Sequence, residues 1–242
     1  MNKRIIVCTM IIAVLASMVF SGCKAKPGEP AGFANASIMQ QDEALPFHGV
    51  WIKAGVNLRK YDKIYVTPVN TSYVYRQSWW QHTNRYNEFY DDVETVAEFM
   101  RETFIDAFKD DPNDRFKVVK HPSADTLILE MAITEFTPNK PFLKVGSYAP
   151  FGAGLAVSLI NTTNLSVVAF EARIRDGGTG EIIAKAMDRE QEKKYLATKK
   201  HLYWYSHARG IIEDWADQFV AIANMQPGDI IEDTKPYDWK MW

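Results

Sequence analysis

Two long segments of this chain carry apolar residues on one helical face only, and this pattern limits the possible folds. The first stripe consists of Val93, Val96, Ala97, Met100, Phe104, Ala107 and Phe108. The second consists of Ala208, Ile211, Ile212, Trp215, Ala216, Phe219, Val220 and Ala223. Apolar residues three and four positions apart form the buried face of a helix. We expect the first helix to begin at Asp91-Asp92 and to end before Asp111-Pro112.

Strand patterns precede and separate these helices. Residues 61–69 and 127–134 alternate between apolar and polar side chains, and a short strand is expected at 116–120. Residues 168–189 are typical of a hairpin, with a glycine-rich turn at 176–180 because a tight reversal needs positive φ. Two amphipathic helices need a sheet face to cover. We therefore predict a single α+β domain with a mixed, mostly antiparallel sheet and both helices packed on one face.

The chain begins like an exported lipoprotein. Two basic residues are followed by a mostly apolar run over 5–20 and then by Ser21, Gly22 and Cys23. This order is typical of a secretory signal peptide. The cysteine after two small residues matches a lipobox, in which the thiol is acylated and the chain is cut before it. The apolar run is shorter than the roughly 20 residues that span a bilayer. Ordinary signal cleavage and an uncleaved anchor are the alternatives.

These features divide the chain into four parts. We predict a signal peptide over 1–22, a lipidated flexible tether over 23–46, an α+β lipoprotein domain over 47–225 and an aromatic C-terminal tail over 226–242. Proline and glycine break any period in the tether. Lys24 stands where an aspartate would retain an enterobacterial lipoprotein at the inner membrane, so we expect the outer membrane, facing the periplasm. Residues 138–164 give no clear structural prediction.

The composition excludes several classes of function. The two cysteines are Cys8, which leaves with the signal peptide, and Cys23, which lipid would block, so the mature protein has neither a free thiol nor a disulfide. The net charge of −2 becomes more negative without the basic signal peptide, which argues against nucleic acid as a partner. The five histidines lack the spacing of a helical zinc site, and we expect surface or capping roles for them. We expect no metal, no cofactor and no catalytic residue, since no nucleophile or phosphate-loop motif occurs.

The stretch 71–90 is the best candidate for a contact surface. It is polar and aromatic, without a clear period, and long loops in compact domains are often functional. Tryptophan and tyrosine are enriched in contact hot spots. The same rings could instead cover an open edge or face of the sheet. The candidate partner-binding residues are Tyr73, Tyr75, Trp79, Trp80, Tyr86 and Phe89.

Three segments resemble one known family: LRKYDKIYVTPV at 58–69, FEARIRDGGTGEIIA at 170–184 and IIEDWADQFV at 211–220. Together with the lipobox they resemble the bacterial putative lipoproteins grouped as domain of unknown function 3313, over roughly residues 44–224. The family has no assigned activity, so the resemblance implies a fold and a location in the cell envelope and little else.

From these patterns we expect a non-catalytic envelope protein that is attached to a membrane by its lipid. It would dock a periplasmic protein or a peptidoglycan partner through the aromatic stretch. One alternative is a periplasmic hydrolase acting on glycan or lipid with paired carboxylates in the segment 138–164, and another is a carrier of a small apolar ligand. Alternating charges on strands are more typical of a solvated face than of a catalytic pair. The acids considered for such a pair are Glu130, Glu135, Glu171, Asp176 and Glu181.

Overall fold

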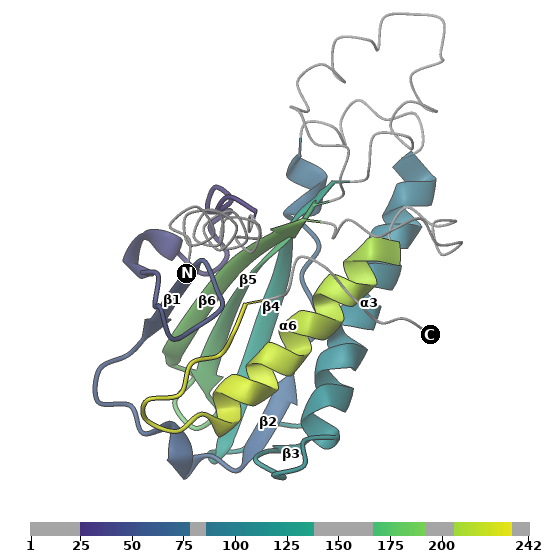
Figure 1. Cartoon of the computed structure of the whole chain (residues 1–242). Coiled ribbons are helices and arrows are strands. Elements are labelled where there is room, and N and C mark those ends of the chain that lie inside the picture. Colours follow the sequence, from purple (N-terminus) through teal and green to yellow (C-terminus); the bar gives the residue numbers. More distant parts are fainter. Residues whose placement is uncertain (1–24, 78–85, 138–166, 192–205, 234–242) are drawn as a thin grey trace, which may run out of the picture.

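The computed structural model describes residues 25–77, 86–137, 167–191 and 206–233. Two long helices, α3 (Tyr86–Lys109) and α6 (Ser206–Asn224), lie side by side across one face of a six-stranded sheet (Figure 1). The strands are β1 (Gly49–Ile52), β2 (Lys63–Val66), β3 (Lys117–Val118), β4 (Thr126–Thr137), β5 (Val167–Asp176) and β6 (Ile182–Gln191). The predicted α+β class, the single domain and the helices on one face are confirmed.

The sheet is antiparallel on one side and parallel on the other. Its strand order is β1-β6-β5-β4-β2-β3. The first four strands of this order pair antiparallel, whereas β2 pairs in parallel with both β4 and β3. Helix α3 connects β2 to β3, because two strands that run in the same direction need a crossover between them. The predicted hairpin is confirmed as β5 and β6, and β1 is a strand that the sequence analysis missed.

Aromatic rings fill the space between the sheet and the helices. Trp215 of α6 is fully buried, and its ring centroid lies 4.6 Å from that of Phe170 on β5. Phe219 lies 5.2 Å from Phe104 of α3 and 5.1 Å from Phe47, so one cluster joins both helices to the segment before β1. Burial of one large apolar side chain contributes about 1.5–3 kcal/mol, and this cluster is therefore a main source of stability.

Helix α3 is longer than predicted at its start and agrees with the prediction at its end. It begins at Tyr86 and not at Asp91, so the last part of the aromatic stretch is helical. It ends at Lys109, just before a proline that cannot continue it. The buried Asp111 then accepts a hydrogen bond from the side-chain amide of Asn224 at 2.9 Å, which fixes the end of α3 beside the end of α6.

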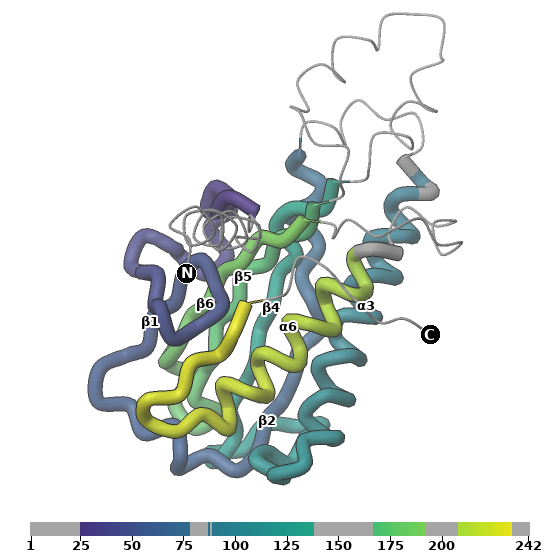
Figure 2. Tube along the Cα trace, viewed as in Figure 1, coloured from purple at the N-terminus to yellow at the C-terminus, as the bar shows by residue number. Residues whose placement is uncertain are grey.

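Residues 25–46 form part of the fold. They run beside β1 and over the sheet face opposite the helices (Figure 2). Ala25 and Ala34 are buried, and Gln40 forms an isolated bridge with Val50 of β1. The C-terminal residues return to the same segment, since the N–H of Ile231 donates to the carbonyl oxygen of Ala44 at 3.0 Å. The prediction of a flexible tether is therefore wrong for these residues.

No helix within the described residues has both the length and the apolar content that crossing a bilayer requires. The predicted signal peptide and Cys23 lie outside the described residues.

Candidate functional site

One buried carboxylate holds the N-terminal segment on the sheet. Glu171 of β5 is 2% exposed, and it points away from the helices because it alternates with the core residue Phe170. One of its oxygens accepts the backbone N–H of Ala31 at 2.6 Å and that of Gly32 at 3.3 Å. The other accepts the N–H of Ala34 at 2.6 Å. A buried charge is costly unless it is hydrogen-bonded, and three backbone donors satisfy it here.

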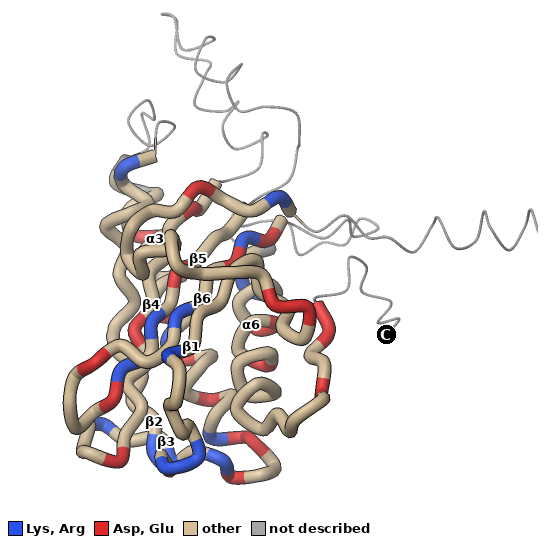
Figure 3. Tube along the Cα trace, turned by 90° about the vertical axis from the view of Figure 1, so that its left-hand side faces the viewer, with Lys and Arg blue, Asp and Glu red and all other residues tan. Residues whose placement is uncertain are grey.

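Two arginines bind the same segment from neighbouring strands. Arg173 of β5 donates to the carbonyl oxygen of Phe33 at 3.1 Å, and its guanidinium lies 4.2 Å from the centroid of the Phe33 ring. Arg189 of β6 pairs with Glu135 at 2.6 Å and donates to the carbonyl oxygen of Lys26 at 3.2 Å. The hydrogen bond to Glu135 raises the pKa of Arg189. Basic and acidic positions thus lie next to each other on these strands (Figure 3).

A polar chain links the core of the domain to its first described residue. The buried Asp188 of β6 accepts the indole N–H of Trp215 at 2.9 Å, and its other oxygen lies 2.5 Å from Nδ1 of His48. Nε2 of His48 lies 2.7 Å from the carbonyl oxygen of Ala25. Because a carbonyl oxygen only accepts, Nε2 donates to Ala25, and Nδ1 lies 3.3 Å from the backbone nitrogen of Arg189. The expected surface or capping role of His48 is therefore wrong. Its ring fixes a point two residues after Cys23.

This point lies at an edge of the sheet that β1 leaves open. The pairing of β1 with β6 starts at Gly49 opposite Met187, so residues 188–191 of β6 extend beyond β1. Ala25 and Lys26 contact this part of β6 through His48 and Arg189. The ring of His48 therefore bridges this edge and the N-terminal segment, since its Nδ1 accepts the backbone N–H of Arg189 at 3.3 Å.

The structure removes one of the six predicted partner-binding residues from the contact surface. Phe89 is 1% exposed and belongs to the core, so its predicted contact role is wrong. It lies on the buried face of α3, which begins earlier than expected and therefore includes it. Trp79, Trp80 and the side chain of Tyr86 lie outside the described residues.

The remaining two candidates are half-buried and contact other rings. Tyr73 packs edge-on against Phe33 of the N-terminal segment, with 6.0 Å between the ring centroids. Tyr75 stacks on the exposed Tyr90 of α3 at 5.2 Å, and its hydroxyl donates to Glu94 at 2.6 Å. Burial raises the pKa of Tyr75, and the hydrogen bond to Glu94 raises it further. Tyr73 thus contacts the N-terminal segment, and Tyr75 contacts helix α3.

The acids considered for catalysis each have a partner. The pairs are Glu130 with Arg173 and Arg175, Glu135 with Arg189, Glu171 with backbone N–H groups, Asp176 with Tyr61 and Lys60, and Glu181 with Lys53. Hydrogen bonds from the Tyr61 hydroxyl, at 2.7 Å, and from Lys60, at 3.0 Å, hold the pKa of Asp176 well below its usual value. The segment 138–164, where the hydrolase alternative placed its carboxylates, contains no aspartate or glutamate. Within the described residues, no cluster of three metal-binding side chains occurs.

Sequence reasoning did not predict the roles that Glu171 and His48 have in the structure. Glu171 stands in an alternating strand, where a charged residue predicts a solvent-facing side chain. That prediction fails because residues 31–34 cover the strand. These residues bind Glu171 only through backbone N–H groups, so no residue type in the sequence marks the contact. One available signal is Gly32, because its φ of 92° is a backbone conformation that other residues rarely adopt.

Comparison with known proteins identifies a family. No curated protein matches the chain. Similar solved structures include a PelC dodecamer from Paraburkholderia phytofirmans, with 10% identity, a TM-score of 0.36 and coverage of 70% of this chain and 95% of that chain. A DUF4136 family protein from Bacteroides thetaiotaomicron has 9% identity, a TM-score of 0.32 and coverage of 71% and 95%. The lipoprotein GNA1162 from Neisseria meningitidis has 13% identity, a TM-score of 0.25 and coverage of 68% and 99%.

At such identities and TM-scores these structures indicate nothing about an activity or a partner of this chain. The family model is more informative, because it matches residues 29–219 and so includes most of the N-terminal segment, all of α3 and most of α6. The predicted resemblance is confirmed, with an earlier start than residue 44. The chain belongs to the family described as protein of unknown function DUF3313.

Proposed function

We propose that this protein is a lipoprotein of the bacterial cell envelope, anchored through Cys23, that binds an envelope partner and carries out no catalysis. The observation that carries the proposal is the lipobox-like order of residues 5–23, followed at once by a residue that is bound in the fold. Ala25 is buried and hydrogen-bonded, and Cys23 stands two residues before it, after an apolar run and two small residues. Cleavage before Cys23 would leave the described domain attached to the lipidated residue, two positions before a buried contact.

The chemistry of the outer face supports a non-catalytic role. The five acids considered above are engaged by cations, hydroxyl groups or backbone N–H groups, as carboxylates with a structural role are. We propose an outer-membrane location facing the periplasm, because Lys24 and not an aspartate follows the cysteine. The partner would be a periplasmic protein or peptidoglycan, and Trp79 and Trp80 are the residues proposed to contact it.

The anchor is tested by metabolic labelling with a palmitate analogue, followed by membrane fractionation. The wild-type protein should be labelled and should sediment with membranes. Cys23→Ser should lose the label and either leave the membrane fraction or retain the signal peptide. Unchanged labelling of Cys23→Ser would contradict the proposal.

The contact role is tested by chemical crosslinking in intact cells. The double variant Trp79→Ala/Trp80→Ala should keep the wild-type melting temperature and lose crosslinked partners, while Trp51→Ala on β1 is the control for removing a tryptophan elsewhere. A double variant that unfolds would show that these rings belong to the core. One that stays folded and keeps every crosslink would exclude them as contact residues.

A further inference from the structure

The fixed point at Ala25 determines how far the domain can lie from its anchor. The carbonyl oxygen of Ala25 is bound by His48, and that of Lys26 by Arg189. Two residues of extended chain span at most about 7 Å, which is the reach from Cys23 to this point. Resting on the proposed lipidation of Cys23, we propose that the domain lies directly on the bilayer surface in one orientation, with the end of the sheet formed by Thr137, Val167 and Gln191 toward the lipid.

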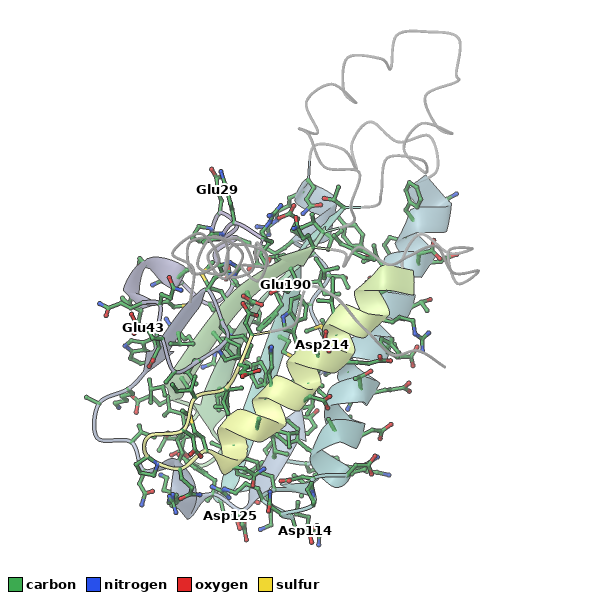
Figure 4. All side chains as sticks on the ribbon, in the orientation of Figure 1. Glu29, Glu43, Asp114, Asp125, Glu190 and Asp214 are labelled. Atoms are coloured by element: carbon green, nitrogen blue, oxygen red, sulfur yellow. The ribbon has the colours of Figure 1, made fainter. Side chains whose placement is uncertain are left out.

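Strand pairing identifies this end. Thr137 of β4 pairs with Val167 of β5, which pairs with Gln191 of β6, so the three strand ends lie side by side. Arg189, which holds the N-terminal segment, is only two residues from the last of them. Glu29, which belongs to this segment, lies at the same end of the molecule, and Asp114 lies at the opposite end (Figure 4).

A free tether would produce a different arrangement. The 22 or so residues between Cys23 and the predicted start of the domain would span about 25 Å on average as a flexible chain, so any face could meet the bilayer. In the structure these residues are bound along the sheet by Glu171, Arg173 and Arg189. They therefore add no free chain length between the lipid anchor and the domain. Lys24 and the exposed Lys26 flank the fixed point, and cations beside a lipid anchor add attraction for anionic headgroups.

The orientation can be measured by energy transfer from a dye on the protein to an acceptor on lipid headgroups. The lipidated mature protein has no other free thiol, so one introduced cysteine is labelled selectively. Arg76→Cys places the dye near the docked segment, since Arg76 lies over the ring of Tyr73, which contacts Phe33. Arg76 is also far from Cys23 in sequence, so a free tether would not hold it near the bilayer.

Lys117→Cys places the dye at the far end. Lys117 is in register with Lys63, and Lys63 with Thr126 at the start of β4. Glu135 of β4, the partner of Arg189, marks the end that holds the N-terminal segment. The nine residues of rise from Thr126 to Glu135 place these two ends of β4 roughly 30 Å apart. The proposal therefore predicts strong transfer from position 76 and weak transfer from position 117.

The protein is reconstituted in vesicles of phosphatidylethanolamine and phosphatidylglycerol that contain the acceptor lipid. Inserting 20 Gly/Ser residues between Lys24 and Ala25 keeps the docked segment but adds a spacer of about 25 Å, and it should lower transfer from position 76 to the level of position 117. Arg189→Ala, which releases the carbonyl oxygen of Lys26 next to the fixed point, should also lower it. Glu181→Ala, which removes an exposed carboxylate on the β5–β6 turn, should leave it unchanged.

Equal transfer from the two positions in the unaltered protein, or no effect of the insertion, would overturn the proposal while leaving lipidation intact. A protein that carries no lipid label and does not float with the vesicles would refute the anchor itself and with it the orientation.

Discussion

Replacement of Glu171 tests whether one carboxylate holds the N-terminal segment to the domain. In Glu171→Gln a single oxygen can still accept from Ala31 and Gly32, but the new amide group faces the N–H of Ala34, so two donors meet at a buried position. An unsatisfied buried donor costs about 1–3 kcal/mol, and a hydrogen bond to a charged group is worth about 1.5–3 kcal/mol. We expect Glu171→Gln to lower the stability of the segment by about 2–3 kcal/mol.

Two assays separate local release from global unfolding. If the segment opens together with the domain, the loss should lower the melting temperature by roughly 4–12 °C for a chain of this size. If it opens alone, chymotrypsin should cleave after Phe33 faster in the variant while the melting temperature stays near that of the wild type. Glu181→Gln is the matched control, because its exposed pair with Lys53 is worth about 0–1 kcal/mol. A Glu171→Gln protein with unchanged melting and unchanged cleavage would refute the assigned role of Glu171.

Two further predictions concern the buried polar groups of the domain. Trp215→Phe keeps most of the ring volume but removes the donor to Asp188, and it should lower the unfolding free energy in urea by about 2–4 kcal/mol; a variant as stable as wild type would show that this hydrogen bond is dispensable. Asp176→Asn should be less stable than wild type at neutral pH, because Tyr61 and Lys60 stabilise the charged form in the folded state. Since the folded-state pKa lies below the unfolded value of about 3.9, this contribution is present above pH of about 4 and is lost as the pH falls further. The difference in unfolding free energy between the wild type and Asp176→Asn should therefore become smaller in acid. A difference that stays constant down to low pH would contradict the role assigned to the charged form of Asp176.

The elements that sequence reasoning predicted well are those with a strong local period. The stripe around Trp215 and the alternation around Phe170 each appear within a few residues, because one face of each element is buried. β1 was missed because Gly49–Ile52 is only four residues long and shows no alternation. The start of α3 was misplaced because Asp91 and Asp92 resemble capping residues, although they lie within the first turns of the helix.

The N-terminal site could not be predicted for a different reason. Glu171 meets Ala31 and Ala34 across about 140 positions of sequence, and both partners contribute backbone N–H groups. Every residue except proline carries such a group, so no residue type marks the contact. The ring of His48 is similarly bound to the carbonyl oxygen of Ala25. A segment rich in small residues and proline then has the composition of a linker while it forms an ordered part of the fold.

Hydrogen exchange of the backbone amides in the N-terminal segment tests the central claim most directly. The lipidated protein is exchanged in detergent and the amides of Ala31 and Ala34 are followed individually. If Glu171 binds them as described, an opening free energy of at least about 2 kcal/mol should slow their exchange by roughly 30-fold or more relative to an unstructured peptide. Exchange at the rate of an unstructured peptide would show that residues 25–46 are a tether after all and would contradict the account.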